Sequence, residues 1–188
     1  MKKNIFGITL AMSITLSLTG CAPGISSDGS ELSTPKGTAF YVDSAVSGVT
    51  ASCGATVSLT DIDGKFTYEV GESCTFLLGN IWLRDQNGIT DGKMILEDNV
   101  DVAQFLQSLD NDNNKENGIE ITAVVSDRLA LMGITKVPET EDELIDIITQ
   151  LQQAGIGFGG DFVTKEEAQN HVNQTERKIK NPEYFKQL

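Results

Sequence analysis

Residues 65–84, KFTYEVGESCTFLLGNIWLR, decide the fold class of this chain. β-Branched and aromatic residues fill its short runs, and glycine-containing breaks separate the runs, a pattern typical of β-strands joined by turns. Apolar residues recur at every second position of the first two runs: Phe66, Tyr68 and Val70, then Cys74, Phe76 and Leu78. Because successive side chains of a strand point to opposite faces, we expect one face of each strand in the core.

Strand-like runs also precede this stretch, at TAFYVD (38–43), AVSGVTAS (45–52) and TVSLT (56–60). Asp61-Ile62-Asp63-Gly64 supplies a glycine where a chain reversal needs a positive φ. The sequence therefore predicts five or six antiparallel strands over residues 37–84, arranged as a small β-sandwich.

The first 36 residues predict export and a lipid anchor. Lys2 and Lys3 precede an apolar run over residues 5–18, which is too short for a stable membrane span and typical of a secretory signal. The run ends in Leu-Thr-Gly-Cys at 18–21, which resembles the lipobox of bacterial lipoprotein precursors. That resemblance implies a signal peptide over residues 1–20, lipidation of Cys21 and, since Ala22 follows, an outer-membrane location. The alternative is an ordinary secretory peptide with a chance cysteine. Residues 22–36 are rich in Ser, Gly and Pro, which predicts a flexible tether.

The two remaining cysteines form an even pair in an oxidising compartment. Cys53 shares its parity with Val49 and Ala51, so it is expected to point inward as Cys74 does. We predict a Cys53–Cys74 disulfide, which would close a ring of about 22 residues and stabilise the fold by roughly 3 kcal/mol. A metal pair or a reactive thiol is the alternative, but no CxxC spacing, partner histidine or local basic charge accompanies the cysteines.

Residues 98–188 have mainly helical patterns. Apolar residues at helical spacing predict a helix over residues 98–109. Thr140 with Glu143, and Thr164 with Glu167, have the spacing of capping boxes at the starts of two further helices. The predicted fold class is therefore α+β: a disulfide-linked antiparallel sandwich followed by three or four helices, within one domain over residues 37–188.

The segments VDSAVSGVTASCG and TDIDGKFTYEVGESCTFLLGNIWL, with VAQFLQSLDNDNNKENGIEI and EEAQNHVNQTE further on, support a resemblance. They resemble a module of Gram-negative surface lipoproteins and adhesins, found at the N-terminus of mucin-degrading metalloprotease lipoproteins of the accessory-colonization-factor type. The resemblance covers most of the mature chain and implies a prealbumin-like sandwich. It does not extend to the peptidase, because the chain has no HExxH motif. The module's similar motif around His171 implies that this histidine docks the last helix onto the body.

Composition excludes several classes of function. The chain has 14 Lys and Arg against 27 Asp and Glu, a formal net charge of −13, so it lacks the basic surface that nucleic-acid binding needs. A single histidine excludes most histidine-based triads and any zinc site with several histidines. Asp43, Asp61 and Asp63 are paired-carboxylate candidates, but no base or nucleophile accompanies them. We predict that the chain is not an enzyme.

One acidic segment is a candidate metal site. Asp110, Asp112 and Asn114 place oxygen ligands at alternate positions, as in the first half of an EF-hand loop, and Glu116 continues the series. Lys115 stands where that loop has its glycine, and Ile121 stands where it has its bidentate glutamate. Two interpretations remain: a weak extracellular calcium site, or a surface loop whose side chains cap their own turns. No other cofactor is indicated.

These features predict a non-enzymatic, adhesin-like lipoprotein of the outer membrane. Its expected partners are the membrane, through the N-terminal lipid, and a protein or glycan ligand. The alternative is a periplasm-facing accessory lipoprotein of an envelope assembly or secretion system. The sequence does not indicate an oligomeric state.

Overall fold

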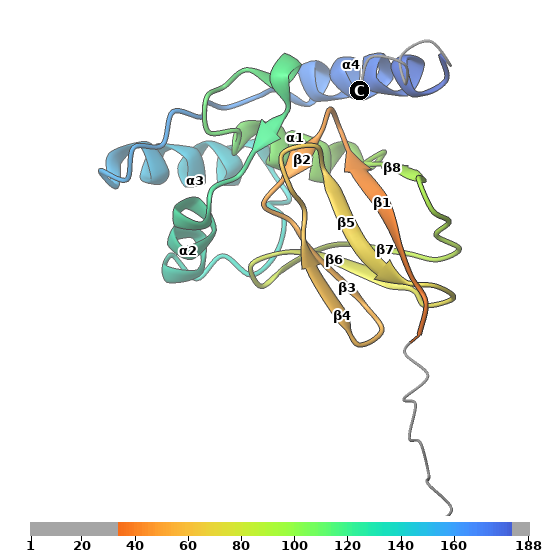
Figure 1. The fold of residues 1–188 in the computed structure, drawn as a ribbon. Coiled ribbons are helices and arrows are strands. Elements are labelled where there is room, and N and C mark those ends of the chain that lie inside the picture. Colours follow the sequence, from red (N-terminus) through yellow and green to blue (C-terminus); the bar gives the residue numbers. More distant parts are fainter. Residues whose placement is uncertain (1–33, 182–188) are drawn as a thin grey trace, which may run out of the picture. The chain divides into compact units, whose positions relative to one another are not determined.

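The computed structural model describes residues 34–181, so the predicted signal peptide, Cys21 and most of the tether lie outside the described part. Within that part the chain has mixed α+β content, with helices gathered toward one end of the strands (Figure 1). The first strand of the described residues begins at Lys36, next to the expected domain boundary at residue 37.

The strands of residues 34–181 form three sheets. The first has the order β5-β1-β8, the second pairs β2 with β9, and the third has the order β4-β3-β6-β7. Their bounds are β1 Lys36–Val42, β2 Val46–Ser47, β3 Thr50–Cys53, β4 Thr56–Leu59, β5 Lys65–Glu69, β6 Cys74–Leu78, β7 Ile81–Gln86, β8 Met94–Leu96 and β9 Ile119–Glu120.

The strand pairing is only partly antiparallel. The four-stranded sheet and the β1–β5 pair are antiparallel, as expected. However, β1 pairs with β8 in parallel, and so does β2 with β9. Both parallel partners come from beyond residue 84, because the chain needs a long crossover to return in the same direction. The chain thus adds two short strands after β7: β8 lies between the predicted sandwich part and the helical part, and β9 lies within the mainly helical part.

Three aromatic side chains join the two larger sheets. Phe76 of β6 stacks on Tyr41 of β1 with ring centroids 4.7 Å apart, and it meets Phe66 of β5 edge-on at 5.1 Å. All three rings are fully buried. Such stacked and edge-on pairs add stability beyond the area they bury. The expected inward parity is confirmed for Val49, Ala51 and both cysteines, but the side chain of Val70 is half exposed just after β5.

Four α-helices occur in the described residues: α1 Val100–Ser108, α2 Ala123–Leu131, α3 Glu141–Gln153 and α4 Lys165–Ile179. Thr140 caps α3, its hydroxyl accepting from the N–H of Glu143. Thr164 caps α4 in a reciprocal capping box with Glu167. These caps satisfy backbone N–H groups that have no partner inside the helix, which explains why the helices begin at these residues. In the described part, no helix is long and apolar enough to cross a membrane.

Candidate functional site

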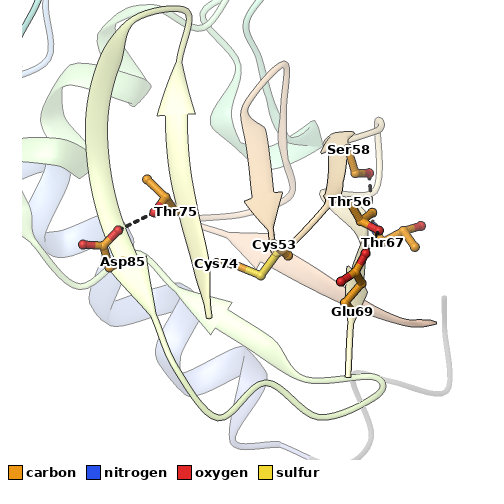
Figure 2. The surroundings of a disulfide bond; sticks show 8 residues. All are labelled: Cys53, Thr56, Ser58, Thr67, Glu69, Cys74, Thr75 and Asp85. Atoms are coloured by element: carbon orange, nitrogen blue, oxygen red, sulfur yellow. Dashed lines mark hydrogen bonds between the residues drawn. A yellow bond between two sulfur atoms is a disulfide. The ribbon is translucent and has the colours of Figure 1, made fainter. Parts of the chain in front are cut away.

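The predicted disulfide joins neighbouring strands of the four-stranded sheet. Cys53 of β3 lies directly opposite Cys74 of β6 in the antiparallel register, and their sulfur atoms are bonded (Figure 2). The side chains of both residues are buried. Next to the bridge, the hydroxyl of Thr56 donates to Glu69 at 2.9 Å, which links the edge strand β4 to β5 of the other sheet. The disulfide prediction is confirmed.

The outer face of the four-stranded sheet has a row of side chains across its strands, of which three are apolar and one is a threonine. The register places Leu59 of β4 opposite Thr50, Thr50 opposite Leu77 of β6, and Leu77 opposite Trp82 of β7. Leu59 is 62% exposed and Trp82, the only tryptophan of the chain, is 54% exposed. We call Leu59, Thr50, Leu77 and Trp82 the outer row. Large apolar side chains that share an exposed face typically mark an interaction surface.

Polar groups flank Trp82 on the same face. Asp85 Oδ1 accepts a hydrogen bond from the hydroxyl of Thr75 at 2.7 Å and a longer one from Trp82 Nε1 at 3.4 Å. Figure 2 shows Thr75 and Asp85 on neighbouring strands. The aromatic ring is thus held at one edge, and its exposed surface remains available for contact.

A second candidate site lies where the turn after β1 meets helix α4. Ser44 Oγ lies 3.0 Å from His171 Nε2, and the Ser44 N–H donates to Thr175 Oγ1 at 3.2 Å. Ser44 has a φ of 56°, a left-handed conformation that is costly for a residue with a Cβ. From α1, Gln107 donates through Nε2 to Asp43 Oδ2 at 2.7 Å. These contacts confirm that His171 docks the last helix onto the body.

The arrangement of Asp43, Ser44 and His171 is not that of a catalytic triad. Asp43 Oδ1 lies 3.8 Å from His171 Nε2, the same ring nitrogen that faces Ser44 Oγ. A serine–histidine–aspartate triad needs the serine and the aspartate on opposite ring nitrogens, so that the carboxylate orients the ring. The geometry therefore favours a docking contact between helix and turn.

Burial changes the acid–base behaviour of Asp43 and His171. Asp43 is fully buried, and its desolvation raises the pKa of the carboxyl from 3.8 to about 7, although the Gln107 hydrogen bond opposes the change. Desolvation also lowers the pKa of the His171 imidazole below its ordinary 6.5. The Asp43 Oδ1 and Gln107 Oε1 atoms are buried without a hydrogen-bond partner. Both shifts favour neutral groups, since burial penalises the charged forms.

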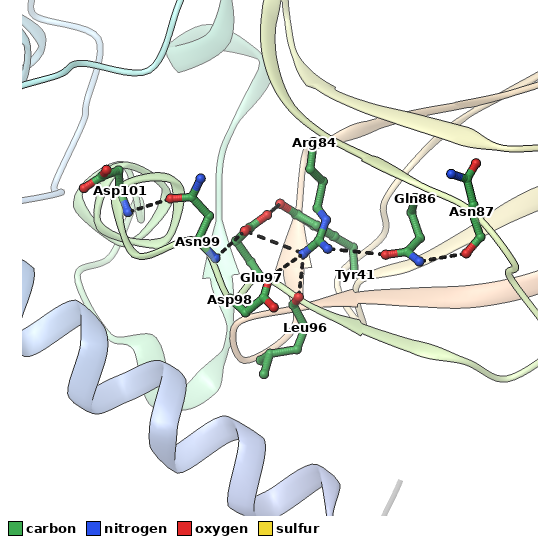
Figure 3. A network of polar contacts seen from close by, with 9 residues as sticks. All are labelled: Tyr41, Arg84, Gln86, Asn87, Leu96, Glu97, Asp98, Asn99 and Asp101. Atoms are coloured by element: carbon green, nitrogen blue, oxygen red, sulfur yellow. Dashed lines mark hydrogen bonds and ion pairs between the residues drawn. The ribbon is translucent and has the colours of Figure 1, made fainter.

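A second buried polar network surrounds Glu97. Tyr41 donates its phenolic hydroxyl to Glu97, and Arg84 Nη1 lies 3.6 Å from the same carboxylate (Figure 3). Arg84 also donates to the Leu96 carbonyl at 2.6 Å. Burial is the main reason that the pKa values of Glu97 and Tyr41 are raised. The network joins β1, β7 and the segment after β8, and its charges are paired as buried charges normally are.

A cavity of about 420 Å³ lies beside the Ser44 turn. Its apolar lining comes from β1, β8 and the end of α4, including Phe40, Met94 and Ile179. Lys65 and Lys178 are its basic lining residues and Asp63 is its acidic one. Asp61, the other carboxylate of the turn before β5, accepts hydrogen bonds from the N–H groups of its own loop.

The structure places the four residues of the predicted calcium site in different surroundings, and pairs one of them, Glu116, with a lysine. Asp110 is fully buried and Asp112 is exposed, and burial raises the pKa of Asp110 while the Asn117 amide lowers that of Asp112. Asn114 precedes a short 3₁₀ turn, and Glu116 pairs with Lys178 of α4 at 3.3 Å. Among the described residues, no three His, Cys, Asp or Glu side chains converge as metal ligands.

Sequence reasoning did not identify the outer row or the Glu97 network. A signal for Trp82 was present, because it lies between Ile81 and Leu83, which face inward, and therefore had to point outward. No comparable signal marked Glu97, because its partners come from strands far apart in the sequence.

No protein-family model, curated protein or solved structure matches the chain.

Proposed function

We propose that the chain is an outer-membrane lipoprotein, anchored through lipids on Cys21, that acts as a non-enzymatic, adhesin-like binding module. The lipobox at 18–21 and the tether after it support the anchor. The two larger sheets, which share the core around Phe76, would be the layers of a prealbumin-like sandwich. The observation that carries the proposal is the outer row, with its half-exposed tryptophan on a sheet face reinforced by a disulfide.

The partner we assign to the outer row is a protein. A leucine at 59 and one at 77 accompany a single aromatic ring, and aliphatic side chains offer little to the hydroxyls of a sugar. Protein interfaces are enriched in aromatic residues at their core and depleted in charged ones. The net charge of −13 favours a partner whose rim around its apolar patch is basic.

The anchor is tested by labelling cells with palmitate. The full-length chain should incorporate the label, and Cys21→Ala should abolish incorporation and release the protein from the membrane fraction. Protease added to intact cells should degrade a surface-displayed chain. Degradation only after the outer membrane is opened would instead support the periplasm-facing alternative.

Partner binding is tested with the full-length lipoprotein in detergent, applied to arrays of extracellular proteins and glycans. Binding should shift the fluorescence emission of Trp82, the chain's only tryptophan. Trp82→Ser should reduce the affinity for the partner at least about tenfold, as expected for an interface anchor. Leu131→Ser is the matched control, because Leu131 is 80% exposed on α2 and lies outside the outer row. Equal loss in both variants, or binding to glycans alone, would contradict the proposed surface.

A further inference from the structure

The loop between α1 and β9, residues 110–118, has a buried carboxylate oxygen without a partner. Asp110 is fully buried, and its Oδ1 accepts the Glu120 N–H at 3.0 Å. Its other oxygen, Oδ2, is buried and makes no hydrogen bond. An unpaired buried carboxylate oxygen is costly, because it loses its hydration without replacement. This atom therefore calls for a positively charged or hydrogen-bonding partner.

The backbone of the loop turns sharply between Asp110 and Asn113. The Asn113 N–H donates to the Asp110 carbonyl at 3.2 Å, and Asn113 has a φ of 55°. Asp112 lies within this turn and is exposed; its Oδ1 accepts the Asn114 N–H at 3.0 Å and its Oδ2 accepts the Asn117 amide at 2.9 Å. The turn thus places the carboxyls of Asp110 and Asp112 two residues apart in one tight reversal of the chain.

The basic side chains near the loop leave the Asp110 oxygen without a bonded cation. Lys178 is engaged with Glu116 at 3.3 Å, which also removes Glu116 from the predicted ligand set. Lys115, in the same loop, makes no hydrogen bond to the Asp110 Oδ2 atom either.

We propose that this loop binds one Ca²⁺ ion between the carboxylates of Asp110 and Asp112, with the side-chain oxygen of Asn114 as a further ligand. The donors are hard oxygen atoms in an irregular turn, which suits the variable coordination of calcium, whereas Mg²⁺ demands a near-ideal octahedral set. Only two carboxylates contribute, so the affinity falls in the range of extracellular modules, with a dissociation constant of about 0.1 to 1 mM.

The bound ion would stabilise a loop that is connected to β9, to the segment before α4, and to α4 itself. The loop carries β9, which pairs with β2, and the Asn111 carbonyl accepts from the Gly159 N–H at 3.2 Å before α4 begins. Glu116 adds the ion pair to Lys178 on α4. Calcium would therefore fix the connection between the helices and the sheets, a role independent of the protein partner assigned to the outer row.

Titration of the full-length chain in non-ionic detergent, after treatment with a chelator, tests the proposal. Ca²⁺ should bind by calorimetry, and 10 mM Ca²⁺ should raise the melting temperature by about 3 to 6 °C if the dissociation constant is near 1 mM. The absence of both heat and thermal shift would overturn the proposal, and an equal response to Mg²⁺ would overturn its assignment to calcium.

Two variants locate the ion. Asp110→Asn keeps an acceptor for the Glu120 N–H, so without metal it should fold at least as stably as the wild type, but it should lose the Ca²⁺ response. Asp112→Asn should weaken Ca²⁺ binding at least about tenfold, as a lost ligand charge requires. Asp127→Asn, an exposed change on α2, is the control and should respond as the wild type does. A Ca²⁺ response that survives in both loop variants would place the ion elsewhere and refute the site.

Discussion

Replacing Asp43 by asparagine should change how the stability of the protein depends on pH. The asparagine amide has the same shape and keeps an acceptor for Gln107 Nε2, which lies 2.7 Å from Asp43 Oδ2. It removes the only charge that the buried position 43 acquires. The variant therefore isolates the cost of ionising this carboxyl between the turn after β1 and helices α1 and α4.

The pKa of Asp43 sets the size and sign of the effect. It is about 7 in the folded chain against an ordinary 3.8, a difference of roughly 3, which corresponds to about 4 kcal/mol at 1.36 kcal/mol for each pH unit. Because the folded-state pKa is raised, the stabilising contribution is fully present below pH 3.8 and is lost as the pH rises through 7. His171, whose folded-state pKa is lowered, contributes oppositely: its contribution is lost as the pH falls below 6.5. Both proteins keep His171, so its contribution largely cancels in their difference.

Urea unfolding at pH 4, 5, 6, 7 and 8 measures this difference. Relative to the wild type, Asp43→Asn should gain stability steadily with pH, by up to about 4 kcal/mol between pH 4 and pH 8. Asp127→Asn, at an exposed position, should show no such trend. A difference between Asp43→Asn and the wild type that stays constant with pH, or that falls as the pH rises, would refute the assignment of a buried neutral carboxyl at Asp43.

Three further changes test the core. The double variant Cys53→Ala/Cys74→Ala should lose about 3 kcal/mol of unfolding free energy, measured by urea unfolding, and dithiothreitol should bring the wild type to the same midpoint. Arg84→Met should lose about 3 to 5 kcal/mol of unfolding free energy at pH 7, because it leaves the buried Glu97 carboxylate without its cation. Adding Glu97→Gln should recover part of that loss, and no recovery would contradict the pairing of Arg84 with Glu97. Gly48→Ala should lose at least about 2 kcal/mol by thermal unfolding, because φ is 88° and the new Cβ would lie 2.0 Å from a carbonyl oxygen after β9. A neutral effect there would argue against the β2–β9 pairing.

Local patterns predicted much of the fold. The alternation around Phe76 indicated the buried face of β6, because a half-buried strand must repeat every two residues. The disulfide was predictable because Cys53 and Cys74 share inward parity in a chain that the sequence predicts to be exported. The capping residues Thr140 and Thr164 located the starts of α3 and α4, since a capping bond involves only neighbouring residues.

Features that depend on distant partners were not predictable. The strands β8 and β9 are short, and each is defined by a parallel partner more than fifty residues earlier in the chain, so neither carries a local pattern of its own. Asp43 looks in the sequence like the carboxylates of the nearby turn, and only the packing of α1 and α4 buries it. The candidate calcium loop was predicted from the spacing of its Asp and Asn residues. The unpaired oxygen of Asp110 and the ion pair between Glu116 and Lys178 depend on tertiary packing, which that spacing does not reveal.

The Cys53–Cys74 bridge also affects how the protein tolerates proteolysis. The segment that it closes includes the exposed turn around Ile62, whose side chain is 76% accessible, so that a protease can reach the turn. A cut there opens the loop, but the two pieces stay covalently joined through the sulfur atoms, β4 stays paired with β3, and β5 stays paired with β1. A chain nicked at this turn would thus remain a single particle, and only a reducing environment would let its halves separate.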